Sequence, residues 1–272
     1  MTQRIFIKEI CAQEGITVQT LSHDYVFCLT RGDVTRHIFG AFWDINSAAA
    51  DRIACDKCAC YSILNKHGIP AVRHELLNNP LLRQDWLGTF NAPSGGVWSQ
   101  ALALFELFGK RAVLKPNQGS MGQDVFHCDT IPALEAAAQA IFTTQPNAAI
   151  SPYLEIETEY RVFYVTGDCP LAYAKTPDLA NSWQHNLAKG AKASEIPGGQ
   201  KRLAHELNSL ASRAAKTIGI NFATVDIVLL KTGELMVMEI NSGVQAKYLL
   251  EQLPHLREVI KDIYARAIRE MF

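Results

Sequence analysis

Hydrophobic residues occur along this chain in short runs and in longer stretches with helical spacing, which indicate strands and helices respectively. Near the N-terminus the runs are short, so we expect strands, and Arg31-Gly32-Asp33 between two of them predicts a hairpin turn. These expected strands are at 5–7, 18–21, 25–29 and 35–40. An alanine-rich amphipathic stretch then predicts one helix over 47–67, ending at Gly68.

The rest of the chain alternates between helices and short buried strands. Helices are expected at 97–108, 130–140, 201–218 and about 254–270, and strands at 112–114, 149–154, 160–166, 224–230 and 235–241. Polar residues and glycines predict loops at 78–96 and 177–200. The order lacks the regular strand–helix–strand rhythm of one parallel sheet, so it predicts a mixed α/β, or α+β, fold.

Composition narrows the possible classes of protein. The chain has 272 residues, of which 48% are hydrophobic and 19% charged, as in globular proteins. The net charge of −1 gives no bulk attraction to nucleic acid or to an anionic membrane, and no apolar run approaches the ~20 residues of a membrane span. Seven cysteines, an odd number, and a start that does not resemble a secretory signal indicate reduced thiols. We therefore expect a cytoplasmic protein that binds neither nucleic acid nor membrane.

The closely spaced Cys55, Cys58 and Cys60 leave two interpretations open. With His67 or His74 they could complete a zinc site, which needs four ligands. Alternatively, they are small apolar side chains packed on a helix, as free cysteines often are. The chain lacks the second cysteine pair typical of zinc sites, which favours packing.

The strongest chemical signal is a predicted hairpin near the C-terminal end. Two apolar runs are joined there by Lys231-Thr232-Gly233-Glu234. If Thr232-Gly233 forms a two-residue loop, Asp226 lies opposite Glu239. The two-residue period of a strand then places Asn241 on the same face.

Such a face suits a metal ion. Two facing carboxylates repel each other unless a positive charge lies between them. Carboxylate and amide oxygens are hard ligands, and Mg²⁺ typically binds one or two carboxylates together with substrate phosphates. The alternative is a solvated strand face, but the apolar flanking residues indicate a buried hairpin. We therefore expect Asp226, Glu239 and Asn241 to bind Mg²⁺.

A second signal is Lys115, which ends the apolar run Ala112-Val113-Leu114 and precedes Gly119-Ser120-Met121-Gly122. Glycines let backbone N–H groups approach a phosphate, and a lysine at a strand end supplies a positive charge. Because the lysine precedes the glycines, this is not a P-loop. Alone the motif is typical of an ordinary turn, but together with a Mg²⁺ site it indicates a site for nucleotide phosphates.

Further motifs occur in a fixed order around these two. They are Asp56-Lys57 with Ile63-Leu64 and Gly68-Ile69-Pro70, Ile150-Ser151-Pro152-Tyr153-Leu154, Glu159-Tyr160-Arg161-Val162, and Trp183-Gln184-His185-Asn186-Leu187-Ala188-Lys189-Gly190. Combined with the lysine strand, the glycine loop, Asp226 and Glu239-x-Asn241, they resemble the ATP-grasp superfamily, and within it the ribosomal-protein glutamate ligase type. The resemblance covers about residues 50–250.

The resemblance implies an ATP-grasp fold, in which a nucleotide is held between two α+β subdomains. It implies a short N-terminal domain at 1–73, a lid subdomain at 74–154 and a C-terminal subdomain with the Mg²⁺ site at 155–272. The implied cofactors are ATP and Mg²⁺.

The resemblance also implies roles for individual residues. Contacts to ATP are implied for Lys57, Lys115, the lid-loop residues Gly119, Ser120, Met121 and Gly122, the hinge residues Tyr153 and Leu154, and, at the ribose, Glu159 first and Glu157 second. Asp226, Glu239 and Asn241 match the family's Mg²⁺ ligands. Arg161 and Asn186 are expected to stabilise the transferred group, with Lys175 and Lys189 as further catalytic cations. The alternative for Arg161 is a salt bridge to Glu155, Glu157 or Glu159.

Three positions depart from the family's pattern. Ser151-Pro152 stands where the hinge usually has Gln-Glu, so adenine would rely on the backbone of Tyr153 and Leu154. Gln123-Asp124 follows the lid glycines where a further glycine is usual. Gln184 replaces an arginine, and the compensating cation is expected among Arg161, Lys175 and Lys189.

The implied activity is an ATP-dependent ligase that joins a carboxylate to an amine through an acyl phosphate. The expected substrates are amino acids or peptides, and Lys189, Lys192 and Lys247 favour an anionic one. Two other functions stay open: an ATP-grasp kinase acting on a small molecule, and a catalytically decayed ATP-binding module. A carrier or peptide partner and a homo-oligomer are also compatible with the sequence.

Overall fold

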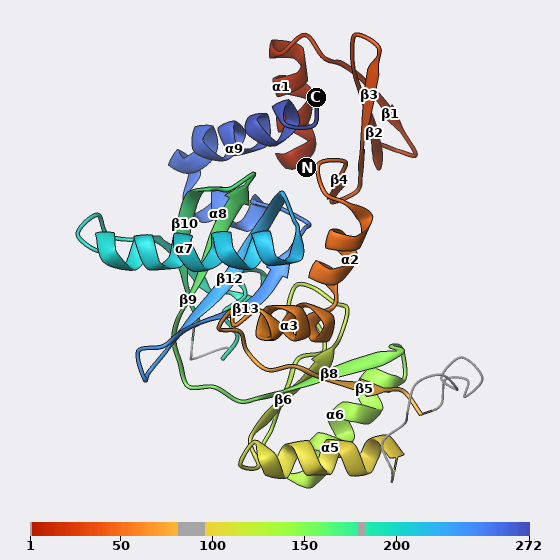
Figure 1. The fold of residues 1–272 in the computed structure, drawn as a ribbon, viewed down its shortest axis with the longest axis vertical. Helices are drawn as coiled ribbons and strands as arrows, with labels where there is room; N and C mark the ends of the chain where they lie inside the picture. Colours follow the sequence, from red (N-terminus) through yellow and green to blue (C-terminus); the bar gives the residue numbers. More distant parts are fainter. Residues whose placement is uncertain (1, 81–95, 179–182) are drawn as a thin grey trace.

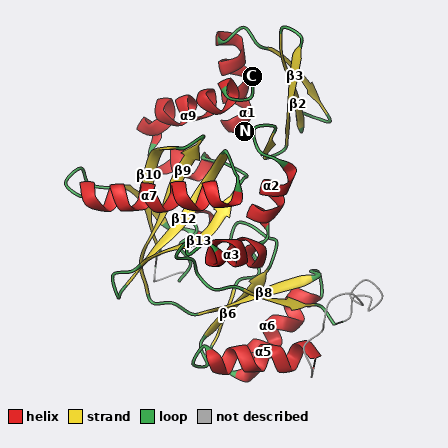
Figure 2. Ribbon diagram, viewed as in Figure 1, coloured by secondary structure: helices red, strands yellow, loops and turns green. Residues whose placement is uncertain are grey.

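The structure is a computed structural model that describes residues 2–80, 96–178 and 183–272. Its strands form three antiparallel sheets (Figures 1 and 2). Most of the loop expected at 78–96, and residues 179–182 of the loop expected at 177–200, lie outside the described residues. Within the described ranges, no helix combines the length and the apolar character needed to cross a bilayer.

The N-terminal part is a helix followed by a four-stranded sheet in the order β1-β2-β3-β4. The bounds are α1 Thr2–Gln13, β1 Thr17–Leu21, β2 Val26–Arg31, β3 Val34–Phe39 and β4 Phe42–Trp43. The predicted hairpin is confirmed, because Arg31 pairs with Val34 around Gly32-Asp33. The strand predicted at 5–7 is wrong, since these residues belong to α1. Phe6, Ile7, Ile10 and Cys11 are buried at helical spacing in one core with the C-terminal helix α9 (Arg257–Arg269) (Figure 1).

The large sheet has the order β11-β10-β9-β12-β13. Its bounds are β9 Ile156–Val165, β10 Asp168–Thr176, β11 Lys192–Glu195, β12 Phe222–Leu230 and β13 Leu235–Asn241. The loop expected at 177–200 therefore contains a strand, because β11 pairs with β10, and a 3-10 turn, η1 (Leu187–Lys189). Helix α7 (Lys201–Ile218) crosses one face of this sheet (Figure 1).

Two short helices, not the single one predicted over 47–67, pack on the same face as α7. They are α2 (Ala48–Cys55) and α3 (Lys57–Lys66). Asp56 separates them with an extended backbone, and its side chain accepts a hydrogen bond from the Ala59 amide at 2.9 Å. A side chain that caps a new helix competes with continuing the old one, so the break follows from Asp56 itself. Gly68 has φ +68°, as expected for a residue just beyond a helix end.

The small sheet has the order β5-β8-β6-β7. Its bounds are β5 Glu75–Asn78, β6 Ala112–Pro116, β7 Phe126–Cys128 and β8 Asn147–Pro152. Helices α5 (Gly96–Leu107) and α6 (Ile131–Phe142) pack on one face, where Leu114 and Ile150 point. Because strand side chains alternate, the neighbouring Val113, Lys115 and Ser151 face the other way. Helix α8 (Lys247–Gln252) and the 3-10 turn η2 (Pro254–Leu256) precede α9.

Each segment of the predicted division 1–73, 74–154 and 155–272 contains one of the three sheets. Helices α2 and α3 of the first segment pack on the large sheet of the third. Helix α9 of the third segment shares a core with α1 of the first. The exact boundaries therefore stay a prediction.

Asn46 links the N-terminal part to the large sheet. Its side-chain oxygen accepts hydrogen bonds from the amides of Asn221 and Phe222, both at 2.9 Å. Its amide nitrogen donates to the Phe222 carbonyl at 2.9 Å and to Asp51 at 3.1 Å. Only 8% of the residue is exposed, so these backbone groups have little access to water if Asn46 is removed.

We expect Asn46→Ala to lower the free energy of unfolding by about 3 kcal/mol, because several buried polar groups would lose their partners. The control is Asn65→Ala on the exposed face of α3, expected to change it by less than about 0.5 kcal/mol. Urea unfolding of both variants checks this, and equal effects would contradict the role given to Asn46.

Candidate active site

A cleft of about 1040 Å³ lies between the small and the large sheet. One wall comes from β6, the loop 116–123 and the hinge after β8, and the other from β9, β10, β12 and β13. All but one of the predicted site residues line it: Lys57, Lys115, Gly119, Ser120, Met121, Gly122, Tyr153, Leu154, Glu157, Glu159, Arg161, Lys175, Asn186, Asp226, Glu239 and Asn241. Lys189, in η1, is not among the lining residues. The roles of these residues stay predictions.

The hairpin of β12 and β13 has the predicted pairing at the site. Asp226 pairs with Glu239 and Thr224 with Asn241. The turn is not the predicted two-residue loop, because the Leu230 amide donates to the Glu234 carbonyl around a three-residue loop. A bulge at Met238 restores the register, since Ile227 already pairs with Val237. The extra residue in the loop is thus offset by the bulge, so Asp226 still lies opposite Glu239.

Asp226 forms the centre of a buried ion-pair cluster. Arg161 donates to both of its oxygens, from Nε at 2.7 Å and from Nη2 at 2.6 Å. Lys175 Nζ lies 3.2 Å from Asp226 Oδ1 and also pairs with Glu159. The side chain of Asp226 is only 2% exposed and that of Lys175 only 4%. Arg161 thus has Asp226 as its partner, and none of the glutamates at 155, 157 and 159.

The cluster remains charged at neutral pH. Burial alone would raise the pKa of Asp226, but Arg161 and Lys175 together hold it well below its usual value. Burial and the charge of Arg161 act to lower the pKa of Lys175, yet Asp226 and Glu159 hold it above its usual value. Each ion is therefore kept charged by its neighbours.

The donor set at the hairpin fits a hard divalent cation. Asn241 Nδ2 lies 3.2 Å from Glu239 and 3.4 Å from Asp226, so the amide lies between the two carboxylates. Turning the amide by half a revolution would present its oxygen beside the two carboxylates, the kind of ligand set that Mg²⁺ takes. Asp226 and Glu239 are the two acidic side chains of this donor set. Within the described residues, no group of three or more His, Cys, Asp or Glu is arranged to hold a metal.

The base of the glycine loop is attached to helix α3. Lys57 Nζ donates to the carbonyls of Gly119 at 3.0 Å and Asn117 at 3.4 Å. Asn117 Oδ1 accepts from the Cys58 amide at 3.1 Å. Helix α3 itself packs on the large sheet, so these contacts connect the loop to the opposite wall of the cleft.

The tip of the glycine loop lies against Gln184, where the resemblance implies an arginine. Gln184 Nε2 donates to the Val125 carbonyl at 3.4 Å. A Cβ added at Gly122 would lie 2.7 Å from Gln184 Oε1, and the φ of Gly122 is +66°. The left-handed backbone therefore favours glycine at this position, and a larger residue would also displace the end of the Gln184 side chain.

Aromatic side chains gather at the hinge end of the cleft. The Tyr153 ring centroid lies 4.1 Å from that of His127 and 6.1 Å from that of Trp183. The guanidinium of Arg111 lies 4.5 Å from the same ring, and the Tyr153 amide donates to the Arg111 carbonyl at 3.0 Å. The amide of Tyr153 is thus already used, whereas its flat ring borders the cleft. Sequence reasoning did not assign His127 and Trp183 to this site.

Two cations from different helices also line the cleft. Arg52 comes from α2 and Lys247 from the start of α8. Phe42 reaches the same cavity from the N-terminal sheet. Of the three lysines expected to favour an anionic substrate, Lys247 lines the cleft, whereas Lys189 and Lys192 do not. Arg52 was missed, although its place one turn before Asp56-Lys57 offered a signal.

The cysteines of α2 and α3 show the features of packing. Cys58 and Cys60 are buried, and burial raises the pKa of each thiol to about 12. Cys55 Sγ lies 3.9 Å from Ser242 Oγ. A thiol with a raised pKa is a poor metal ligand, because metals bind the thiolate.

The chain is similar to proteins of the ATP-grasp type in sequence and in fold. The family model of the RimK-like ATP-grasp domain matches residues 54–254. A curated relative, the probable alpha-L-glutamate ligase 1 of Shewanella frigidimarina, is 35% identical over 137 residues, which are 50% of this chain and 43% of the relative. The chain thus matches less than half the length of that relative.

Solved structures confirm the predicted fold. The D-alanine–D-alanine ligase from Bacillus anthracis has a TM-score of 0.61 at 17% identity, covering 83% of this chain and 70% of that one. The ATP-grasp ligase PsnB, complexed with a minimal precursor, has a TM-score of 0.55 at 18% identity, covering 82% and 64%. With a family match over most of its length and this shared fold, the chain belongs to the RimK-like ATP-grasp family.

Proposed function

We propose that the chain is an ATP-dependent ligase that joins a carboxylate to an amine and releases ADP and phosphate. The observation that carries this proposal is the pairing of two walls across one cleft. Asp226, Glu239 and Asn241 lie on one wall, and Lys115 with the glycine loop lies on the other. In the predicted division into subdomains, the first of these walls belongs to the segment 155–272 and the second to the segment 74–154. The names of the relatives, a glutamate ligase and a D-alanine–D-alanine ligase, support amino acids or peptides as substrates.

The cleft offers a place for each part of ATP. The base would lie against the aromatic side chains at Tyr153, with backbone contacts left to Leu154. Glu159 and Glu157 line the cleft between this end and the charged cluster, where the ribose would lie. The phosphates would then reach Lys115 and the loop from Gly119 to Gly122. Mg²⁺ held by Asp226, Glu239 and Asn241 would supply charge neutralisation at the phosphate oxygens.

The reaction follows from positioning and charge. An oxygen of the substrate carboxylate attacks the γ-phosphorus, ADP leaves, and an acyl phosphate forms. The amine then attacks the acyl carbon, and phosphate departs with the bonding electrons. Arg161 uses Nε and Nη2 on Asp226, and within the described residues no hydrogen bond engages its Nη1. This third nitrogen, together with Asn186, which lines the same cleft, would stabilise the transferred group or the tetrahedral intermediate.

A phosphate-release screen tests this function. The protein is incubated with ATP, Mg²⁺ and pairs of amino acids, and products are identified by mass spectrometry. Amine-dependent release of phosphate with a new amide supports the ligase. A stable phosphoester without released phosphate would show a kinase instead, and ATP binding without turnover on any pair would show a binding module.

Lys115 is a buried cation with an unusual environment. It is 8% exposed, and no ion pair engages it among the described residues. Burial lowers its pKa from 10.5 to about 8, and the charge of Lys57 adds to this while Glu239 opposes it. A buried charge without a partner is unfavourable, which is the condition that an anionic phosphate would relieve.

We expect Lys115→Met to be more stable than the wild type at pH 7 by up to about 3 kcal/mol, because it removes a charge that is costly to bury. Between pH 8 and 10.5 the unfolded chain binds more protons than the folded one, so wild-type stability rises and the difference shrinks. Urea unfolding without nucleotide at pH 7 and pH 10 measures this, with the exposed Lys66→Met as control. A less stable variant at pH 7 would contradict the burial cost.

We expect Glu239→Gln to reduce phosphate release at least about 100-fold while leaving the fold intact. Loss of a Mg²⁺ ligand should remove several kcal/mol of transition-state stabilisation. Glu258→Gln on the exposed side of α9 is the matched control and should keep wild-type activity. Wild-type turnover in Glu239→Gln would rule out the proposed metal site.

We expect nucleotide to protect the loop 119–124 from hydrogen exchange. Met121 is 53% exposed, so few side-chain contacts hold the loop when the cleft is empty. Phosphates would offer partners to its N–H groups, and closure would exclude water from a reactive acyl phosphate. Exchange is compared with and without a non-hydrolysable ATP analogue. Unchanged protection of Ser120–Gln123 with the analogue bound would refute the role of the loop as a lid.

A further inference from the structure

His74 carries a buried nitrogen that the function described so far does not use. It lies in the segment that leads from the large sheet into β5, and 2% of it is exposed. Its Nδ1 lies 2.8 Å from the Val72 carbonyl, which can only accept, so Nδ1 carries the proton and donates. Its Nε2 is then an acceptor, and among the described residues it has no hydrogen-bond partner. Such an atom needs a donor, because an unsatisfied buried polar group is costly.

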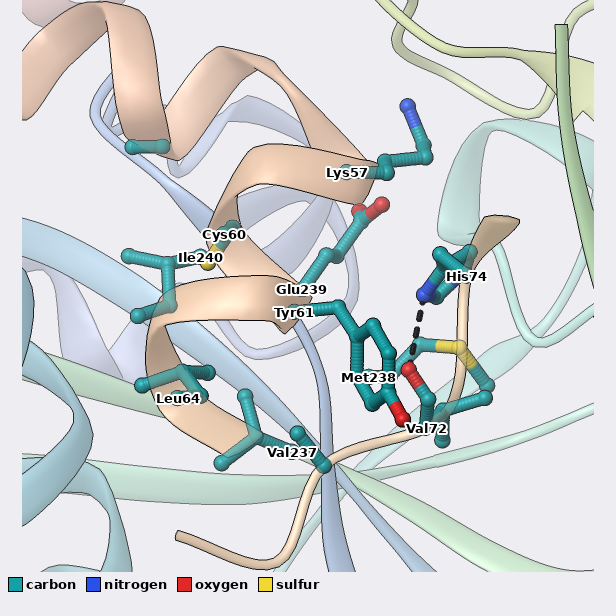
Figure 3. Close-up of a pocket in the computed structure, with 12 residues that line it drawn as sticks. Lys57, Cys60, Tyr61, Leu64, Val72, His74, Val237, Met238, Glu239 and Ile240 are labelled. Atoms are coloured by element: carbon teal, nitrogen blue, oxygen red, sulfur yellow. Dashed lines mark hydrogen bonds between the residues drawn. The ribbon is translucent and has the colours of Figure 1, made fainter. Parts of the chain in front are cut away.

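A small cavity of about 10 Å³ adjoins this histidine. Figure 3 shows its two ends: His74, Glu239 and Lys57 lie at one, and Leu64 and Val237 at the other. This volume corresponds to about one water molecule, which needs polar partners to be stable there. The polar end provides them, whereas the apolar end does not.

Glu239 borders two cavities at once. It lines the main cleft, where Asn241 Nδ2 lies 3.2 Å from its Oε1, and it also lines the small cavity. The residue therefore lies between the cleft and the small cavity. A group in the small cavity can hold the carboxylate without occupying the place of a metal in the cleft.

His74 does not pair with Glu239 as an ion. Burial, and the nearby charge of Lys115, hold the pKa of His74 well below its usual value, so the ring is neutral. With Nδ1 committed to Val72, both the remaining imidazole nitrogen and the carboxylate are acceptors. Both residues line the same small cavity, whose volume suits one water molecule, and a water has two O–H groups that can serve two acceptors.

We propose that His74 and Glu239 share one buried water, and that His74 is thereby a positioning residue for the carboxylate of Glu239. The water donates one hydrogen to His74 Nε2 and the other to the carboxylate. This inference rests on the proposed function, in which Glu239 is a ligand of Mg²⁺. Hydrogen bonds behind a metal ligand fix its orientation, and their loss typically weakens metal affinity by about 10–100-fold.

Two substitutions of His74 test the roles of its two ring nitrogens separately. In His74→Asn, the amide nitrogen can replace Nδ1 and keep the bond to Val72, but nothing replaces Nε2. In His74→Gln, the longer side chain brings a polar atom to the position of Nε2. Cys60→Ala is the matched control, because Cys60 lines the same cavity without a polar group of this kind. Circular dichroism and thermal unfolding establish that each variant is folded.

The readout is binding and not turnover. Mn²⁺, which replaces Mg²⁺ and is visible by electron paramagnetic resonance, is titrated into each protein in the presence of a non-hydrolysable ATP analogue. Affinity for the analogue alone is measured in EDTA. We expect His74→Asn to bind Mn²⁺ about 10-fold or more weakly, with unchanged affinity for the metal-free analogue. His74→Gln and Cys60→Ala should stay within about threefold of the wild type.

The outcomes distinguish this inference from the function on which it rests. Wild-type Mn²⁺ affinity in His74→Asn would overturn the inference alone, as would an equal loss in His74→Asn and Cys60→Ala. If His74→Asn does not fold, a loss in His74→Gln as large as 10-fold overturns it, and retained affinity supports it. No Mn²⁺ binding by the wild type with the analogue would refute the metal site and the inference together.

Discussion

The cluster of Arg161, Lys175 and Asp226 sets the strongest constraint on this structure. Burying ions costs several kcal/mol each, and attraction offsets this cost only when geometry is good and hydrogen bonds are satisfied. Here three adjacent strands provide that geometry, because Arg161 pairs across β9 and β12 with Asp226 and across β9 and β10 with Tyr173. Slipping any of these strands by one residue would move a charge to the apolar face under α7. The cluster therefore constrains the register of these three strands.

One face of the large sheet serves two purposes along its length. Below the cleft it carries the charged cluster, whereas further along β9 and β12 it carries Phe163, Val165 and Phe222. These apolar residues share a core with α1, the N-terminal sheet and α9. In this core Trp43 packs edge-on against Phe222, with 4.9 Å between their ring centroids. The opposite face is covered by α7, α2 and α3. Apolar packing thus stabilises the sheet on both faces, which leaves its charged part free to form the floor of a site.

Sequence patterns predicted the strand pairing at the candidate site better than the elements around it. The pairing of Asp226 with Glu239 was correct, although the loop has three residues and a bulge follows. A bulge depends on local packing, so the two-residue period of side chains could not reveal it. Helix α1 was missed because a short apolar run fits a strand as well as a helix, and only packing against α9 decides. His74 carries no local signal for the role proposed here, since the residues around it come from distant segments.

The positions of the cations bear on Gln184, which stands where the resemblance implies an arginine. Arg161 and Lys175 are held on strands by Asp226 and Glu159, whereas Lys189 does not line the cleft. The charge of this cluster is therefore held by the large sheet and does not depend on the loop that contains Gln184. The loop instead makes a neutral contact, in which Gln184 lies against Gly122 and bonds the Val125 carbonyl. Because Gln184 carries no charge, it can contact the glycine loop without competing with Arg161 and Lys175 for Asp226, so the charge of the cleft floor is the same whatever the loop residue contributes.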